Sequence, residues 1–348
     1  MATDPSGITA DDQVARIFEW RRGFNTIHLI DLGLKLGLFQ ALAESPGLTS
    51  DVLADKLSLK ARHVRVWCWT AHSAALLDAD DQGAFRLAPH IDAILAKPTH
   101  PRFLGGYVQL GVDVAAEDFR RSVDAFRTGE NRPFQGRGDD FARAIAGATW
   151  GLQIATAKKI LPGLPDLAAR LEAGGTILEV GCGTGNFLVQ ALKAFPRARV
   201  IGADLDRESL AIARQRLADA GIQDRATLIE GPLEGRVPDG SLDACVMIEV
   251  LHEIAATIRP AVVAETAKTL KAGGWYVIVD ETYPSTLAQS REAAYLFPVQ
   301  TGFEELTWGN DIPDRAEQER LLREAGLREP FDRMLIGEGF TVLCARRP

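Results

Sequence analysis

The stretch ILEVGCGTG, which runs from Ile177 to Gly185, decides the fold of this chain of 348 residues. A short apolar run ends in a glycine-rich turn, and a helical pattern follows at Phe187–Phe195. Glycines allow the backbone to turn tightly and to approach a ligand, because no Cβ stands in the way. The spacing Gly-x-Gly-x-Gly differs from the Gly-x-Gly-x-x-Gly fingerprint of dinucleotide sites. The stretch therefore predicts a strand, a ligand-binding turn and a helix.

Two acidic residues lie close to this turn. Glu179 comes just before it and would repel a pyrophosphate, whereas it suits a ligand with positive charge. Asp204 ends the next expected strand, where a carboxylate can accept hydrogen bonds from both ribose hydroxyls. Together with the glycines, these carboxylates favour a nucleoside ligand that carries a cation.

After Gly175, short apolar runs alternate with helical patterns. We expect strands at Thr176–Val180, Val200–Asp204, Ala226–Ile229, Ala244–Ile248 and Trp275–Asp280, and helices at Phe187–Phe195, Ser209–Ala220 and Ile258–Leu270. This alternation predicts βαβ units and a mostly parallel sheet. Two extended runs, Arg333–Ile336 and Phe340–Ala345, predict a final hairpin that adds an antiparallel strand to the sheet.

The N-terminal part of the chain follows a different pattern. Three helical patterns between Ile27 and Ala74 are followed by a turn at Asp80–Gly83 between two short extended pieces. Helices followed by a hairpin predict a winged-helix domain at residues 1–100. We expect residues 101–172 to form a helical linker that contributes to the substrate pocket, and residues 173–348 to form the α/β domain.

The composition excludes several classes of protein. A net charge of −8 argues against a sequence-independent grip on nucleic acid. The chain has no run of about 18 apolar residues and no N-terminal signal, so we expect neither a membrane span nor secretion. The four cysteines lie far apart and lack zinc spacing. They predict free thiols in a reducing compartment, hence a cytoplasmic protein, and no metal site.

Glu-Val-Gly-Cys-Gly-Thr-Gly resembles motif I of the class I methyltransferases that use S-adenosylmethionine (SAM). The resemblance extends over roughly Gly175 to Pro348 and implies a Rossmann-like domain with SAM as its cofactor. It implies that the glycines cradle the amino-acid part of SAM, that Asp204 binds the ribose and that Leu205 packs on the adenine. Pro232 replaces the Asp that usually reads the adenine amine, so backbone groups are expected to recognise it. The expected cofactor residues are Glu179, Gly181, Cys182, Gly183, Gly185, Asp204, Leu205, Gly231, Pro232, Leu233, Ile248 and Glu249.

His252 and Glu253 follow the fourth expected strand, at the sheet edge where ligands bind in this kind of fold. The pair resembles the His-Asp pair of small-molecule O-methyltransferases of the caffeic acid and hydroxyneurosporene type. That resemblance implies that His252 is a general base, oriented by Asp280 at the end of the fifth strand, with Glu253 as a third catalytic residue. Histidine has a suitable pKa for this task. The motif LKLGLF at Leu34–Phe39 resembles the same family's dimerisation domain and implies a homodimer.

The acceptor pocket is expected to be lined by aromatic residues. The candidates are Tyr107, Phe141, Trp150, Phe297 and Trp308, of which Phe141 lies in a segment that resembles the family's interdomain helix. The segment Thr282–Pro313 follows a strand and is expected to be a long loop that acts as a lid. An acidic acceptor would need an arginine, for which Arg120, Arg121 and Arg143 are candidates.

The expected function is methyl transfer to a small-molecule acceptor, first of all to a hydroxyl oxygen. Sulfur stays open as the acceptor atom, because a thioether or thiolate needs no base. An example is the methylthio hydroxy acid of dimethylsulfoniopropionate synthesis. Carbon and nitrogen are further alternatives. A winged-helix regulator that binds DNA is an alternative of another class. Residues 1–100 hold ten Lys and Arg against twelve Asp and Glu, and Trp67 and Trp69 on the presumed recognition helix favour a buried or subunit interface.

Overall fold

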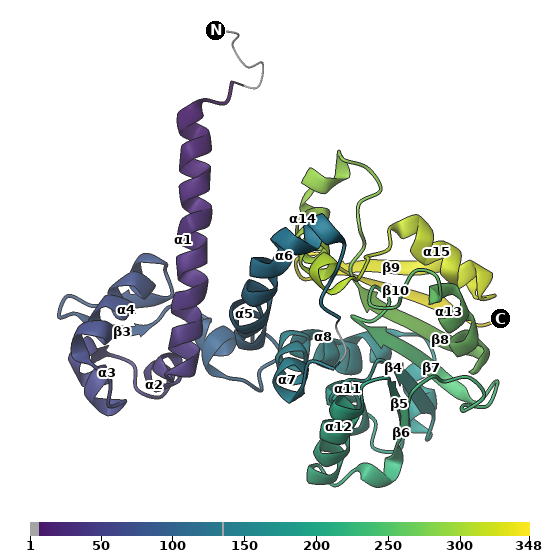
Figure 1. Cartoon of the computed structure of the whole chain (residues 1–348). Helices are drawn as coiled ribbons and strands as arrows, with labels where there is room; N and C mark the ends of the chain where they lie inside the picture. Colours follow the sequence, from purple (N-terminus) through teal and green to yellow (C-terminus); the bar gives the residue numbers. More distant parts are fainter. Residues whose placement is uncertain (1–6, 134–135) are drawn as a thin grey trace. The chain divides into compact units, whose positions relative to one another are not determined.

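The computed structural model describes residues 7–133 and 136–348 and divides the chain into two compact units (Figure 1). The first unit ends at Asp113 and the second begins at Val114. The three-part division at residues 100 and 172 stays a prediction. Each unit is described by itself.

The first unit consists of helices and a small sheet. Its helices are α1 (Ala10–Lys35), α2 (Leu38–Glu44), α3 (Ser50–Lys56), α4 (Ala61–Ser73) and α5 (Gly105–Leu110), with π-helical turns η1 (Asp92–Ala96) and η2 (Gly111–Ala115), the last at the boundary. Strands β1 (Leu48–Thr49), β2 (Leu77–Ala79) and β3 (Ala84–Leu87) form an antiparallel sheet in the order β1-β3-β2. The helices and the β2–β3 hairpin occur in the expected order, whereas β1 is an addition.

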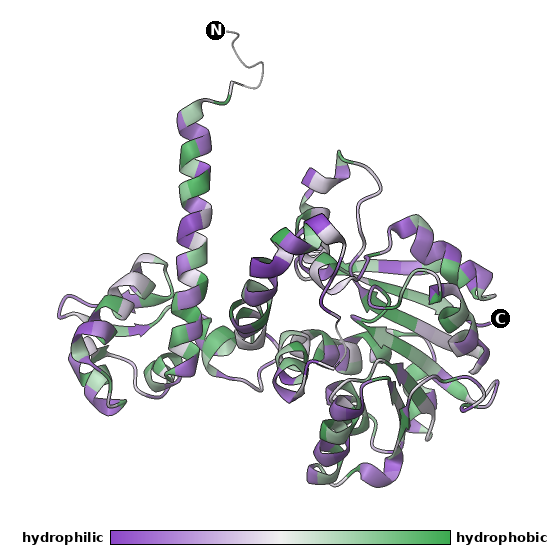
Figure 2. Ribbon diagram, viewed as in Figure 1, coloured by the Kyte–Doolittle hydropathy of each residue, from purple (hydrophilic) through white to green (hydrophobic). Residues whose placement is uncertain are grey.

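Helix α1 begins at a reciprocal cap and carries apolar residues that the unit does not bury. The Asp12 amide donates to the Thr9 hydroxyl at 3.2 Å, and the Thr9 amide donates back to the Asp12 carboxylate at 2.8 Å. Apolar residues recur along the helix (Figure 2), and seven of its large apolar side chains are exposed, namely Val14, Ile17, Phe18, Trp20, Phe24, Ile27 and Leu32.

The core of the first unit forms around Trp67 of α4. Its indole N–H donates to the Leu29 carbonyl at 2.9 Å, and its ring meets Phe39 edge-on. Gly33 allows this packing, because a Cβ there would lie 2.4 Å from the Phe39 ring. Trp69, on the same helix as Trp67, is 69% exposed.

The second unit is built on a seven-stranded sheet. Its strands are β4 (Thr176–Val180), β5 (Arg199–Asp204), β6 (Ala226–Glu230), β7 (Leu242–Ile248), β8 (Leu270–Asp280), β9 (Arg328–Ile336) and β10 (Phe340–Arg346). The order is β6-β5-β4-β7-β8-β10-β9. The first five strands pair in parallel, and β10 pairs antiparallel with both β8 and β9. The predicted mostly parallel sheet and its closing hairpin are confirmed.

Helices cover both faces of this sheet, because its strands are apolar on both sides (Figure 2). Ile177 packs with α11 (Asn186–Ala194) and α12 (Arg207–Asp219) on one face. Leu178, the next residue, packs with α13 (Arg259–Lys268) and α15 (Arg315–Glu324) on the other. A 3₁₀ turn, η4 (Gln223–Arg225), precedes β6.

A run of short helices leads into the sheet. It comprises α6 (Ala116–Thr128), α7 (Asp139–Ala148), α8 (Trp150–Ala155), η3 (Thr156–Ile160), α9 (Leu161–Gly163) and α10 (Leu167–Glu172). The helical character expected for this region is therefore confirmed over the described residues.

The expectation of a long loop at Thr282–Pro313 is wrong. The segment holds η5 (Gln289–Arg291), α14 (Ala293–Glu305) and η6 (Leu306–Trp308). Pro298 and Gly302 favour a loop locally, but Phe297 packs on Phe340 of β10 with ring centroids 4.9 Å apart, and Pro298 itself is buried. Tertiary packing thus outweighs local propensity here.

All four cysteines are free and buried. Cys68 belongs to the first unit, and Cys182, Cys245 and Cys344 belong to the second. Among the described residues, no single helix has the length and apolar character of a membrane span. Only α1 and α2 taken together pass that test, and they are bent by 64°.

Candidate functional site

The glycine-rich turn after β4 has the backbone that only glycine adopts without strain. Gly181, Gly183 and Gly185 have φ angles of 67°, 47° and 75°. A Cβ on Gly181 would lie 2.4 Å from the Val250 side chain, and one on Gly185 would lie 2.9 Å from Ala213. The turn therefore needs glycine both for its dihedral angles and for its close packing.

A cavity of about 860 Å³ lies beside this turn. Ten of the twelve expected cofactor residues line it, namely Gly181, Cys182, Gly183, Asp204, Leu205, Gly231, Pro232, Leu233, Ile248 and Glu249. The other two, Glu179 and Gly185, are not among the lining residues. The fold thus brings most of the expected cofactor residues around one cavity, at the carboxyl ends of β4, β5, β6 and β7.

Asp204 braces the glycine turn. Its carboxylate accepts hydrogen bonds from the Gly183 amide at 2.7 Å and from the Asp206 amide at 2.8 Å. Burial raises the pKa of Asp204, which these backbone donors only partly offset. The side chain is half-buried and lines the cavity, so the residue joins the turn to the space beside it.

Glu179 is a buried carboxylate in need of a partner. It is 2% exposed, and its Oε2 accepts no hydrogen bond from the described residues. Burial, with a smaller contribution from the Asp204 charge, raises its pKa well above the ordinary value. A buried carboxyl group without donors is costly, so the site suits a ligand with positive charge or an acidic proton.

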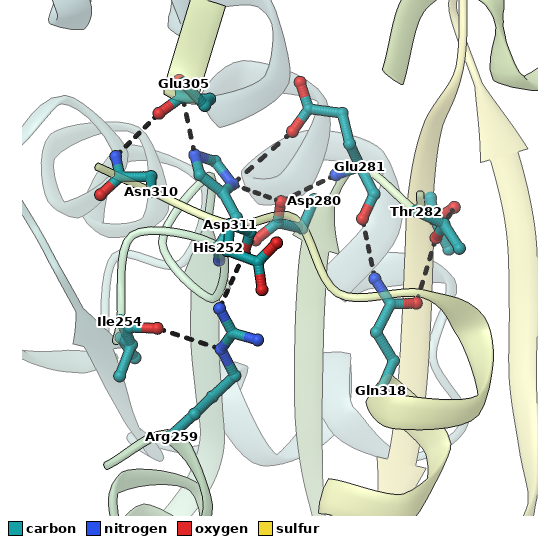
Figure 3. A network of polar contacts seen from close by, with 11 residues as sticks. His252, Ile254, Arg259, Asp280, Glu281, Thr282, Glu305, Asn310, Asp311 and Gln318 are labelled. Atoms are coloured by element: carbon teal, nitrogen blue, oxygen red, sulfur yellow. Dashed lines mark hydrogen bonds and ion pairs between the residues drawn. The ribbon is translucent and has the colours of Figure 1, made fainter. Parts of the chain in front are cut away.

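His252 is held by the carboxylate that ends β8 (Figure 3). Its Nδ1 lies 2.6 Å from Asp280 Oδ1, and its backbone N–H donates to Asp280 Oδ2 at 3.3 Å. Both residues are buried. The pair of contacts fixes the ring orientation, as Asp-His pairs do where a histidine must hold one tautomer.

The other ring nitrogen of His252 faces a second carboxylate. Nε2 lies 3.8 Å from Glu305 Oε1 at the end of α14 (Figure 3). Burial alone would lower the pKa of His252, but the charges of Asp280 and Glu305 outweigh it and hold the pKa well above its ordinary value. His252 does not line the cavity, although Val250 and Glu253 beside it do.

Further carboxylates lie close to this histidine. Glu281 Oε2 lies 3.6 Å from His252 Nδ1 and accepts no hydrogen bond from the described residues. Burial raises the pKa of Glu281 to about 7. Burial also raises the pKa values of Glu249 and Glu253, and Glu249 holds the left-handed φ of 57° that non-glycine residues rarely adopt. Ligand atoms of His252, Asp280 and Glu281 lie within 4.8 Å of one another, a spacing that also suits a metal ion.

A fully buried arginine anchors the loop that carries His252. The Arg259 guanidinium donates to the Ile254 carbonyl at 3.0 Å and to the Asp311 carbonyl at 2.8 Å (Figure 3), and it pairs with Glu317 at 2.7 Å. The Asp311 amide in turn donates to the His252 carbonyl at 3.4 Å. These contacts tie the segment after β7 to the segment after α14.

The aromatic residues expected in the acceptor pocket lie in different places. Phe141 of α7 lines the cavity. Trp308 is buried, and its indole N–H donates to Asp118 at 2.8 Å. Phe297 packs on β10, and Trp150 is half-buried outside the cavity lining. Tyr107 belongs to the first unit and is 44% exposed.

Three residues that the structure brings to the site were not among the predicted site residues. Glu305 and Glu281 flank His252, and Arg137 lines the cavity. The arginines expected for an acidic acceptor, Arg120, Arg121 and Arg143, are exposed instead and do not line it. Glu281 directly follows Asp280 and was within reach of the strand-end argument, whereas Glu305 and Arg137 reach the site only through tertiary packing.

The core of the second unit matches a known domain family. Residues 177–274 match the model of a methyltransferase domain. The chain is 31% identical over 113 residues to demethylmenaquinone methyltransferase of Symbiobacterium thermophilum, a match that covers 32% of this chain and 44% of that protein. It is 25% identical to 3-hydroxy-5-methyl-1-naphthoate 3-O-methyltransferase of Streptomyces sahachiroi, over 85% of this chain and 84% of that protein. The first of these relatives is therefore matched over less than half of its length.

A solved structure resembles the chain over nearly its whole length. Human N-acetylserotonin methyltransferase, solved in complex with SAM, superimposes with a TM-score of 0.78 at 18% identity, covering 98% of this chain and 99% of that one. At this level of identity the likeness shows the fold. The expected class I methyltransferase fold with an N-terminal helical domain is confirmed.

Proposed function

We propose, from the methyltransferase domain that this chain contains, that the protein transfers the methyl group of SAM to a hydroxyl oxygen of a small molecule. The observation that carries the proposal is the His252–Asp280 pair, 2.6 Å apart, in a segment whose residues Val250 and Glu253 line the same cavity as most of the expected cofactor residues. A relative that aligns over most of the chain, the naphthoate 3-O-methyltransferase, supports an oxygen acceptor.

The residues around the cavity fit SAM. The glycines leave the turn free of Cβ atoms. Glu179 lies outside the cavity lining, but it is buried just before the turn, and its Oε2, which has no donor among the described residues, suits a positive charge. Asp204 lines the cavity and would bind the ribose, and Leu205, 65% exposed beside it, would cover the adenine. When bound, SAM supplies an electrophilic methyl group on a sulfonium. Backbone groups near Pro232 would recognise the adenine amine.

His252 would take the proton of the acceptor hydroxyl. Asp280 occupies Nδ1 and so leaves Nε2 as the nitrogen that accepts the proton. In this structure Glu305 faces Nε2, so the acceptor hydroxyl would have to enter between Glu305 and the ring. Glu253 lines the cavity one residue further on and would position the acceptor. A base of this kind contributes about 10²–10⁴-fold to the rate.

The proposal is tested with SAM that is labelled in its methyl group. The protein is incubated with a panel of small phenols, alcohols and thioethers, and the labelled product is identified. A product labelled on oxygen supports the proposal, whereas a product labelled only on sulfur supports the alternative in which no proton leaves. Calorimetry that detects no binding of S-adenosylhomocysteine (SAH), the demethylated cofactor, would overturn both.

A homodimer built through the first unit is part of the proposal. Several large apolar side chains of α1 are exposed, and exposed apolar patches are typical of protein–protein interfaces. A cytoplasmic location stays a prediction from the sequence.

A further inference from the structure

Arg137 is a buried arginine whose hydrogen-bonding capacity is only partly used. Its side chain is 7% exposed and lines the cavity. One guanidinium nitrogen, Nη2, pairs with Asp118 Oδ2 at 2.7 Å. The other two, Nε and Nη1, are buried and have no hydrogen-bond partner among the described residues.

The guanidinium is held in place from three sides. It lies 4.1 Å from the centre of the Phe141 ring and 5.8 Å from that of Trp308. Trp308 also donates to the same Asp118 oxygen that pairs with Arg137. Residues of α6, α7 and η6 thus fix one side chain at the cavity wall, which is the arrangement of a prepared binding group.

Arg137 shares its carboxylate partner with a second arginine. Asp118, 3% exposed, is shared between Arg137 and Arg132, whose Nη1 lies 3.0 Å from it. Arg132 also lies 3.7 Å from Glu117 Oε1, whereas the carboxylate that pairs with Arg137 is that of Asp118. Burial lowers the pKa of Arg137, yet a guanidinium stays charged in proteins. Buried N–H groups of a cation without acceptors are costly, and an anion in the cavity would satisfy them.

We propose that Arg137 binds a carboxylate inside the cavity. Two sources supply this chemistry, the methyl acceptor and the methionine part of the cofactor. Arginine suits either, because its N–H groups form strong, charge-assisted hydrogen bonds to carboxylate oxygens. The inference rests on the proposed function, and it makes Arg137 the residue that selects an acidic group.

The first experiment tests the cofactor as the source. Calorimetry compares SAH with its decarboxylated analogue on the wild type, Arg137→Met and Arg137→Lys. If the cofactor supplies the carboxylate, Arg137→Met weakens SAH by about tenfold or more and leaves the analogue nearly unchanged. Arg137→Lys, which keeps the charge, restores part of the affinity. Arg143→Met, at an exposed arginine of α7 outside the cavity lining, is the matched control.

The second experiment tests the acceptor as the source. Binding of 4-hydroxybenzoate and of acetate to the wild-type protein saturated with SAH is compared with binding of the corresponding amides. If the acceptor supplies the carboxylate, the acids bind about tenfold or more tightly than the amides, and Arg137→Met removes the difference while SAH affinity stays within about threefold.

The comparisons of acid with amide, and of SAH with its analogue, use the wild type and do not depend on how well a variant folds. The inference is overturned if the wild type binds the acids no more tightly than the amides and SAH no more tightly than its decarboxylated analogue, and if Arg137→Met binds SAH as tightly as the wild type does. If the wild type binds no SAH at all, it is the proposed function that fails.

Discussion

The charge state of His252 determines when this residue can accept a proton. Asp280 and Glu305 hold its pKa above the ordinary value of about 6.5, so the ring stays protonated to higher pH than a free histidine. We expect the rate of hydroxyl methylation to fall on the acid side, with a midpoint above about pH 6.5.

His252→Ala should lower turnover by about 10²-fold or more and leave SAH affinity nearly unchanged. A sulfur acceptor loses no proton, so the turnover of the wild type would then show no acid limb. His252→Ala would then raise KM more than it lowers turnover. A fully active variant would exclude the residue from both schemes.

Glu305 should tune the same titration. Glu305→Gln removes one negative charge beside Nε2, so the imidazolium is less stabilised and the pKa of His252 falls. The acid limb of the rate profile should therefore move to lower pH. Glu304→Gln, one residue earlier on α14, keeps the three carboxylates next to the His252 ring, those of Asp280, Glu281 and Glu305, and serves as the control. An acid limb that stays in place in Glu305→Gln would contradict the role given to this carboxylate.

Asp204 gives a test of the cofactor site that is independent of catalysis. Its carboxylate braces the Gly183 amide and lines the cavity, so Asp204→Ala removes both the brace and the proposed ribose contact. Calorimetry should show SAH binding weakened by about tenfold or more. Asp206→Ala is a comparison within the same cavity lining: it removes the cap of α12, which Asp206 provides through the Ser209 amide at 2.9 Å, and it keeps the Asp204 carboxylate. Unchanged SAH affinity in a folded Asp204→Ala protein would remove this residue from the site.

At the scale of elements, the turn between β4 and α11 depends on glycine at position 181. Alanine there would combine a positive φ with a Cβ 2.4 Å from Val250, and overpacking of this kind costs about 1–3 kcal/mol. We expect Gly181→Ala to lower the melting temperature and to weaken SAH binding. Gly235→Ala has nearly the same φ of 68° but no atom within 4 Å of the new Cβ. Gly235→Ala therefore measures the effect of backbone strain without a clash. Equal melting temperatures for the two variants would contradict the expected effect of the clash with Val250.

The elements that the sequence predicts well are those whose signals are local. The five parallel strands and the final hairpin each show a short apolar run, and the structure places them within five residues of the expected bounds. Helix α14 has opposing local signals in Pro298 and Gly302, and only its packing on β10 decides its form. Glu305 and Arg137 lie 53 and 115 positions from His252 along the chain, so no spacing rule brings them to the site. The place of His252 at the ligand edge of the sheet was predictable because the residue follows β7, whereas its pairing with Asp280 at the end of β8 was expected only through the resemblance to small-molecule O-methyltransferases.

At the scale of the whole molecule, α1 presents apolar side chains that need a partner. Phe18 and Trp20 are 61% and 62% exposed. If two copies of this chain cover each other's helices, Phe18→Glu should convert a dimer into a monomer in size-exclusion chromatography with light scattering. Gln13→Glu, a polar change on the same helix, should leave the dimer intact. A wild-type protein that is monomeric at micromolar concentration would contradict the proposed dimer.

Because the four cysteines are buried, the reactivity of their thiols reports on the unfolding of each unit. A buried thiol forms little thiolate, because burial raises its pKa, to about 12 in Cys68, Cys245 and Cys344. Alkylating reagents should therefore react slowly with the folded protein and quickly once a unit unfolds. Cys68 reports on the first unit, and the other three cysteines report on the second. Mass spectrometry of labelled peptides along a denaturant series would therefore measure the denaturant concentration at which each unit unfolds.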